Sequence, residues 1–161
     1  MARGGTDEGL VQVDAVMRAS RVLVAVVAQS ISAVEDQVTF VQFRMLVVIA
    51  SRGPLNLGEV ARHMGVHPSN ATRMVDKLVT AGLVERTDDP ADRRYLSLIL
   101  TPAGHEVVEQ VMSHRRQAIS KVMDAMPSSR RRTLASVLES FAEVAGEPPG
   151  AEEAFILGLP T

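Results

Sequence analysis

The chain has 161 residues, which is enough for one domain of ordinary size and too few for two independent ones. Apolar residues make up 46% of it, with one Tyr, four Phe and no Trp, so we expect a core of Val, Leu, Ala and Met in which helices pack on helices. The formal net charge of −2 gives no support to nucleic-acid binding. The absence of Cys excludes disulfides, thiol-based peroxide sensing and zinc fingers, and it fits a reducing compartment.

No segment of the sequence predicts a membrane span. The longest apolar run, from Val22 to Ala28, is too short to cross a bilayer, and no basic segment precedes it in the manner of a secretory signal. We therefore expect a soluble, cytoplasmic protein.

Two helices are predicted in the first third of the chain. After a loose start over residues 1–9, apolar residues over much of the circumference predict a long helix over 10–34, and such a helix needs more than one partner. Thr39 and Gln42 then form a capping box, and the helix that they open should stop near Gly53 and Pro54.

A tight helix-turn-helix is predicted from residue 57 onward. The apolar residues of its first helix recur at i, i+3, i+4 and i+7: Leu57, Val60, Ala61 and Met64. The small Ala61 lets a second helix cross closely, and Gly65 tolerates the positive φ that the turn requires.

The second helix of this pair has one apolar and one polar face. Pro68 fits its first position, where the missing N–H costs nothing. At ~100° per residue the polar face contains Ser69, Asn70, Thr72, Arg73, Asp76 and Lys77. An ordinary amphipathic surface helix would show the same division, but Ser, Asn, Thr and Arg in the first two turns can also bond base edges in a major groove.

His67 occupies the expected N-cap of this second helix, where Ser, Thr, Asp or Asn would cap better. Two interpretations stay open at this position. The ring is either a weak cap exposed to solvent or a phosphate ligand strengthened by protonation.

A β-hairpin is predicted next, with strands over 83–86 and 95–100. In the second strand Leu96, Leu98 and Leu100 should alternate against Tyr95, Ser97 and Ile99. The connecting loop over 87–94 is polar and long for a plain turn.

The tip of this loop carries a candidate DNA contact. Arg93 and Arg94 can enter a minor groove, where negative potential is focused, and Asp92 can orient Arg94 by a charge-assisted bond. A surface turn with a local Asp–Arg pair is the alternative. If the loop does contact DNA, Asp88 and Asp89 should face away from phosphate.

Two further helices are predicted over residues 104–146, with a break near Pro127 and a tail over 147–161 that is either frayed or docked. Two basic clusters in this region, Arg115-Arg116 and Arg130-Arg131-Arg132, are interpreted as solvated faces. A phosphate contact or an acidic inducer near Arg115 is the alternative.

Metal, cofactor and catalytic sites are not predicted. His63, His67, His105 and His114 are interpreted as structural or surface residues. The chain has no Gly-rich phosphate loop, no nucleophile elbow and no coupled carboxylate pair, so we expect it not to be an enzyme.

Residues 39–104 resemble the MarR family of winged helix-turn-helix transcriptional regulators. The resemblance rests on Leu57-Gly-Glu-Val-Ala-Arg, Gly65-Val, Pro68-Ser69, Arg73-Met-Val-Asp-Lys-Leu, Gly82-Leu-Val-Glu-Arg and, most specifically, Asp92-Arg-Arg-Tyr-Leu-Ser-Leu-Ile-Leu-Thr-Pro-Ala-Gly104. His67 departs from the usual Ser, and Met126-Pro-Ser-Ser lacks the acidic residues that often open the last helix.

The resemblance implies a mainly α fold with a small β-hairpin wing. It implies a DNA-binding lobe over 39–103 within a single domain over 1–161, and dimerisation helices over 10–34 and 104–146. In the family's pattern a homodimer places a recognition helix in each major groove and wing-tip arginines in the flanking minor grooves of a roughly palindromic double-stranded operator. Many members repress, and small phenolic or anionic effectors release them; no ligand-binding residues are assigned here.

A winged-helix module that contacts proteins and has lost DNA binding is the competing hypothesis, because fold alone does not fix function. Residues 54–104 contain six Arg or Lys and six Asp or Glu, and this neutrality favours the alternative.

Overall fold

The computed structural model describes residues 4–88 and 96–146, with side chains from residue 8 onward. Its helices are α1 (Gly4–Ser32), α2 (Phe40–Arg52), α3 (Leu57–Met64), α4 (Pro68–Thr80), α5 (Pro102–Asp124) and α6 (Ser128–Val144), and its strands are β1 (Leu55–Asn56), β2 (Val84–Asp88) and β3 (Leu96–Leu100). This confirms the mainly α fold with a small antiparallel sheet. Asp89, Asp92, Arg93, Arg94 and the tail over 147–161 lie outside the described residues.

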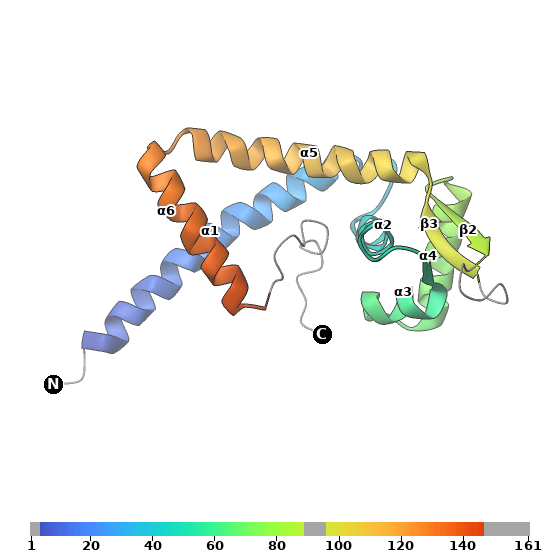
Figure 1. The fold of residues 1–161 in the computed structure, drawn as a ribbon, viewed down its shortest axis with the longest axis horizontal. Coiled ribbons are helices and arrows are strands. Elements are labelled where there is room, and N and C mark those ends of the chain that lie inside the picture. The colour runs from blue at the N-terminus through green and yellow to red at the C-terminus, as the bar shows by residue number, and fades with distance from the viewer. Residues whose placement is uncertain (1–3, 89–95, 147–161) are drawn as a thin grey trace.

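The molecule has a lobe at one end and helical arms at the other. The lobe contains α2, β1, α3, α4, β2 and β3, and it lies at the N-terminal end of α5 (Figure 1). α1 runs obliquely beneath α5 and contacts it. The N-terminal half of α1 extends away from the lobe, and α6 begins at the end of α5 that is far from the lobe. Within the described ranges, no helix combines the length and apolar character that crossing a membrane requires.

Several boundaries differ from the sequence-based expectation; β2, for example, runs over Val84–Asp88 instead of 83–86. α1 begins at Gly4, so the loose start predicted over 1–9 is wrong for its last six residues, and α1 ends at Ser32, ahead of the predicted 34. Strand β1, which the sequence did not predict, consists of Leu55 and Asn56 alone. Two residues are too few to show an alternating pattern, and β1 is a strand because Leu55 and Asn56 pair with Leu98 and Ser97 of β3.

α2 lies at the centre of the core. Its start is the predicted capping box, in which the Thr39 N–H donates to Gln42 Oε1 at 2.9 Å and the Gln42 N–H donates to Thr39 Oγ1 at 3.4 Å. The buried residues of α2 are Phe43, Met45, Leu46, Val47, Val48 and Ile49. They form one cluster with apolar residues of the lobe and of α5, so the lobe and the first turns of α5 share a core.

β3 is the central strand of the sheet, in the order β1-β3-β2. The predicted alternation is wrong at two positions, because Ser97 is fully buried and Leu96 is 54% exposed. Ser97 lies between Asn56 of β1 and Thr87 of β2, whereas Leu96 pairs with Asp88 at the outer end of the hairpin, beyond the core. In β3, burial of a side chain therefore depends more on its position along the hairpin than on the face of the sheet to which it points.

The first turn of α5 is fixed against the base of the hairpin. Thr101 Oγ1 donates to the Gly82 carbonyl at 2.6 Å and accepts from the Gly104 N–H at 3.1 Å, so one hydroxyl caps α5 and ties it to the turn before β2. A Cβ at position 104 would lie 2.1 Å from the Leu83 carbonyl oxygen. Only glycine allows this close approach.

The arms expose apolar surface that the described chain does not cover. None of the residues of α6 is buried. The large hydrophobic side chains exposed on α6 are Val137, Leu138, Phe141 and Val144, and those on α1 include Leu10, Val11, Val13, Val16, Met17, Val22 and Leu23. A helix with an exposed apolar face needs another partner.

Arg115 corrects the interpretation of the basic clusters. Its side chain is only 5% exposed and lies between α5 and α1, so it is not on a solvated face. Arg116, Arg130 and Arg132 are exposed as expected, and Arg131 Nη1 donates to Asp124 Oδ1 at 3.1 Å.

Gly104→Ala should lower the free energy of unfolding by about 1–3 kcal/mol, because the new methyl group forces α5 away from Leu83. Urea unfolding followed by circular dichroism measures this change. Gly9→Ala in α1 is the matched control, since a Cβ there meets nothing within 4 Å and should leave stability unchanged or raise it by up to about 1 kcal/mol. Equal stability of the two variants would contradict the proposed role of the close contact.

Candidate nucleic-acid interface

α3 and the turn after it form the predicted first half of a helix-turn-helix. Asn56 and Glu59 cap α3 reciprocally, at 2.9 Å and 3.0 Å, and Val60, Ala61 and Met64 are buried. Gly65 ends the helix in the left-handed conformation at φ 64°, and the Val66 N–H donates back to the Ala61 carbonyl at 3.1 Å. The prediction of a tight turn at Gly65 is confirmed.

α4 shows the predicted division into two faces. Ala71, Val75 and Leu78 are buried on the side that packs against the lobe. Exposed residues on the other side are Ser69, Asn70, Arg73, Asp76 and Lys77, and Thr72 is half-buried at the boundary. Pro68 occupies the first turn, as predicted.

His67 is exposed and caps α4. The Ser69 N–H donates to His67 Nδ1 at 3.3 Å, and Ser69 Oγ lies 2.8 Å from the same nitrogen. Because a backbone N–H can only donate, Nδ1 is the acceptor and the ring proton is on Nε2. The Ser69 hydroxyl then also donates to Nδ1, so both polar groups of Ser69 are engaged by the cap.

Thr72 has a hydrogen bond of its own. Its Oγ1 donates to the Pro68 carbonyl at 2.9 Å, one turn earlier in α4. The hydroxyl oxygen keeps its ability to accept. In contrast, Asn70, Arg73 and Lys77 form no side-chain hydrogen bond with any other residue that the structure describes.

An ion pair joins α4 to the hairpin. Arg86 Nη2 of β2 lies 2.5 Å from Asp76 Oδ1, with the two side chains 38% and 53% exposed. A pair this exposed contributes little to stability. It connects β2 to the polar face of α4, which β2 also contacts directly.

Sequence reasoning assigned no role to Arg86, although a signal was present. Side chains two residues apart on a strand share a face, so Arg86 lies on the same side of β2 as the buried Val84, although Arg86 itself is exposed. Arg86 also pairs with the buried Leu98 of β3. A charged residue at such a position indicates a partner, which is Asp76.

The hairpin extends from the lobe next to α4. β2 and β3 pair from Val84 with Leu100 to Asp88 with Leu96, and Asp88 is exposed. The tip residues Asp92, Arg93 and Arg94 lie outside the described residues. Their role, and the orientation of Asp88 relative to DNA, stay predictions.

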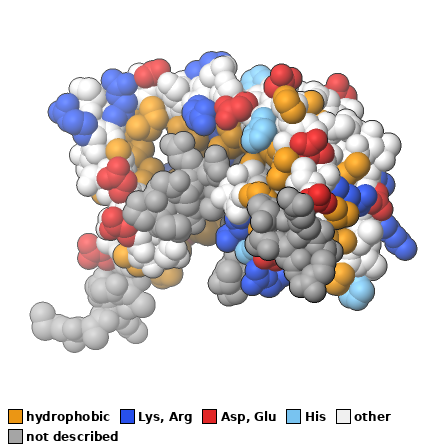
Figure 2. Space-filling view, turned by 45° about the vertical axis from the view of Figure 1, so that its right-hand side comes forward, with side chains coloured by type: hydrophobic (Ala, Val, Ile, Leu, Met, Phe, Trp, Pro, Cys, Tyr) orange, Lys and Arg blue, Asp and Glu red, His pale blue; other side chains and the backbone are white. Residues whose placement is uncertain are grey.

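Charge is mixed over the surface. Basic and acidic side chains are interspersed on the face shown in Figure 2, with hydrophobic side chains between them.

In the lobe, burial and the charges of Arg52 and Arg62 lower the pKa of His63, against a smaller opposite effect of Glu59. These effects favour the neutral form of the His63 ring.

The described residues contain no cluster of three or more His, Cys, Asp or Glu side chains that could hold a metal ion. His63 and His67 are four residues apart, which is a ligand spacing within one helix. The turn at Gly65 separates them, so they do not share a helix face.

Comparison with known proteins agrees with this geometry. The family model for the MarR family matches residues 38–96. The HTH-type transcriptional repressor MdtR of Bacillus subtilis is 30% identical over 108 residues, which are 67% of this chain and 70% of MdtR.

Two crystal structures are also similar. RV1404 from Mycobacterium tuberculosis is 44% identical with a TM-score of 0.74, and the match covers 87% of this chain and 95% of RV1404. The transcriptional regulator Tm0710 from Thermotoga maritima is 29% identical with a TM-score of 0.70, covering 83% of this chain and 93% of Tm0710. Helix pair, hairpin and similarity together show that the chain belongs to the MarR family of transcriptional regulators.

Proposed function

We propose that this protein is a cytoplasmic homodimer that binds a roughly palindromic operator in double-stranded DNA and regulates transcription, as a repressor released by a small effector. One observation carries the DNA-binding part of the proposal. The exposed polar face of α4 is joined to the hairpin by the pair of Asp76 and Arg86, so both elements meet a duplex as one surface.

The polar side chains of α4 differ in whether they already form hydrogen bonds within the protein. Asn70 and Arg73 are exposed and form no side-chain hydrogen bond within the described chain, so we assign the base contacts chiefly to them. The hydroxyl groups of Ser69 and Thr72 already donate hydrogen bonds, to His67 Nδ1 and to the Pro68 carbonyl. They therefore contact bases as acceptors, or as donors after these bonds are broken. Lys77 contacts a DNA phosphate, and Pro68 holds the first turn of α4 close to the sugar-phosphate backbone of the DNA.

The wing supplies the second part of the interface. From the sequence, Arg93 and Arg94 enter the minor groove and Asp92 orients Arg94. The pairing of β2 with β3 supports this assignment, because it carries the chain outward from the end of α4 toward the loop.

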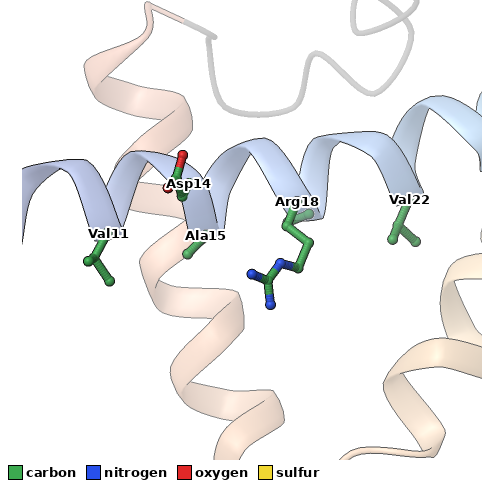
Figure 3. Close-up of a pocket in the computed structure, with 6 residues that line it drawn as sticks. Val11, Asp14, Ala15, Arg18 and Val22 are labelled. Carbon is green, nitrogen blue, oxygen red and sulfur yellow. The ribbon is translucent and has the colours of Figure 1, made fainter.

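The apolar faces of α1 and α6 that no other described residue covers support the homodimer. Val11, Ala15, Arg18 and Val22 project from one side of α1, and they line a hollow of about 640 Å³ (Figure 3). α6 offers a second apolar face with no buried residue. A second copy that covers both faces would place two α4 helices on one duplex, with half-site centres about 34–36 Å apart.

A winged-helix module that binds protein instead of DNA is the second candidate. The equal numbers of acidic and basic residues over 54–104 are the observation in its favour. Binding to duplex DNA and its dependence on salt separate the two functions, because a protein partner gives no systematic release of counterions.

The affinity for operator DNA, selected from genomic fragments, should fall linearly on a plot of log K against log salt, with a slope of about −0.9 for each phosphate contacted. Six contacts in a dimer would weaken binding about 10³-fold between about 50 and 200 mM salt. Fluorescence anisotropy over a salt series measures the slope. Absence of duplex binding at low salt would favour the protein-interaction module.

Arg73→Ala should weaken operator binding by about 1–3 kcal/mol and relax sequence preference at one position of each half-site, because a bidentate contact to a base is lost. Competition with operators substituted one base pair at a time measures the preference. Arg130→Ala on exposed α6 is the control that should leave both quantities unchanged. Equal weakening on every sequence would show that Arg73 contacts phosphate instead.

Phe141→Glu should shift the protein from dimer to monomer in sedimentation velocity and weaken operator binding by at least about 100-fold, since a charge on the apolar face of α6 must be desolvated on association. Ser136→Glu adds the same charge on the opposite face of α6 and should stay dimeric. A dimeric Phe141→Glu variant would refute the assignment of α6 to the interface.

A further inference from the structure

His67 and Ser69 form a hydrogen-bonded pair at the exposed start of α4. Ser69 Oγ lies 2.8 Å from His67 Nδ1, and the Ser69 N–H donates to the same nitrogen over 3.3 Å. The shorter distance belongs to the hydroxyl, so the hydroxyl forms the stronger of the two bonds.

The direction of these bonds decides which hydrogen-bonding groups Ser69 has left for another molecule. A neutral imidazole has one donor and one acceptor nitrogen, and the Ser69 N–H requires Nδ1 to be the acceptor. The hydroxyl proton of Ser69 therefore points at Nδ1, because a nitrogen without a proton cannot donate to the oxygen. Only lone pairs remain on Ser69 Oγ, so the exposed hydroxyl can accept a hydrogen bond but not donate one.

Thr72 is limited to accepting for a different reason. Its Oγ1 donates to the Pro68 carbonyl, a backbone group that is present whatever side chain occupies position 68. The restriction on Ser69 depends instead on one side chain, that of His67. A substitution of His67 can therefore change what Ser69 recognises without altering Ser69 itself.

The major groove of DNA distinguishes an acceptor from a donor at every base pair. Its donors are the amino groups at adenine N6 and cytosine N4, whereas guanine and thymine present acceptors. Each base pair thus has one amino group, and an acceptor on the protein recognises the strand that carries it. A hydroxyl that is free to rotate would not make this distinction, because it can donate or accept.

We propose that His67 is a positioning residue that sets the base specificity of Ser69: by accepting the hydroxyl proton, it makes Ser69 select adenine or cytosine at one position of each half-site. The inference rests on the proposed DNA binding and adds a class of base to one contact of that interface. Arg73, about one turn further along α4, has donors only and selects guanine instead.

Two substitutions of His67 separate this effect from the capping of α4. In His67→Asn the side-chain oxygen can accept from both polar groups of Ser69, as Nδ1 does. In His67→Gly the side-chain acceptor is absent, yet glycine is nearly as good an N-cap as asparagine. The two variants therefore differ chiefly in the acceptor for the Ser69 hydroxyl.

Competition with operators substituted one base pair at a time measures the preference at each position, and Ser69→Ala identifies the position that Ser69 contacts. There the wild type and His67→Asn should bind operators with adenine or cytosine on one strand about three- to tenfold more tightly than those with guanine or thymine, and His67→Gly should reduce this ratio below about twofold. The preference for guanine that Arg73→Ala removes is the internal control, and it should persist in both His67 variants.

The inference is overturned if Ser69→Ala changes the preference at no position, if the two favoured bases are any other pair, or if the two His67 variants behave alike. Because the protein binds its operator in each of these cases, the proposed function then stands. Absence of duplex binding would overturn both proposals.

The hydrogen bond itself can be tested in the free protein by nuclear magnetic resonance. At mildly alkaline pH, where an imidazole is neutral, a long-range nitrogen–proton correlation spectrum should show His67 Nδ1 without a proton and Nε2 with one. A neutral ring with its proton on Nδ1 would refute the arrangement independently of any result with DNA.

Discussion

The close contact between Gly104 and the Leu83 carbonyl is the constraint on which the arrangement of the molecule depends. It joins the first turn of α5 to the base of the hairpin without an intervening side chain, and Thr101 ties the same two segments by hydrogen bonds. α5 continues from this point into the arm, and its first turns share the core of the lobe. A displacement of α5 must therefore reach the hairpin and, through Arg86 and Asp76, the polar face of α4.

Much of the lobe could be predicted from the sequence because its signals are local. The capping box at Thr39, the turn at Gly65 and the proline at the start of α4 each act within a few residues, and each is found where the sequence indicated. The two faces of α4 follow from helical periodicity alone. Because these signals are local, the elements predicted from caps, turns and periodicity agree with the fold that the family resemblance implies.

Features that depend on tertiary contact could not be predicted in this way. β1 is too short to show a pattern, and burial of Ser97 follows from the central place of β3 in the sheet. Arg115 looks like a surface residue beside Arg116 until α1 is placed against α5. Arg86 was open to prediction from strand alternation, because it shares a face with the buried Val84. The tip of the hairpin, with Asp92, Arg93 and Arg94, lies outside the described residues, although its motif is the most specific part of the family resemblance.

The balance of six basic and six acidic residues over 54–104 bears on how such a protein finds its target. Because these charges sum to zero, the lobe as a whole gives a duplex less long-range attraction than a basic domain would, beyond a Debye length of about 8–10 Å. Individual Arg and Lys side chains interact with phosphates only when the protein is docked on the DNA. Recognition of an operator by such a protein would depend on shape and base match after docking more than on long-range attraction.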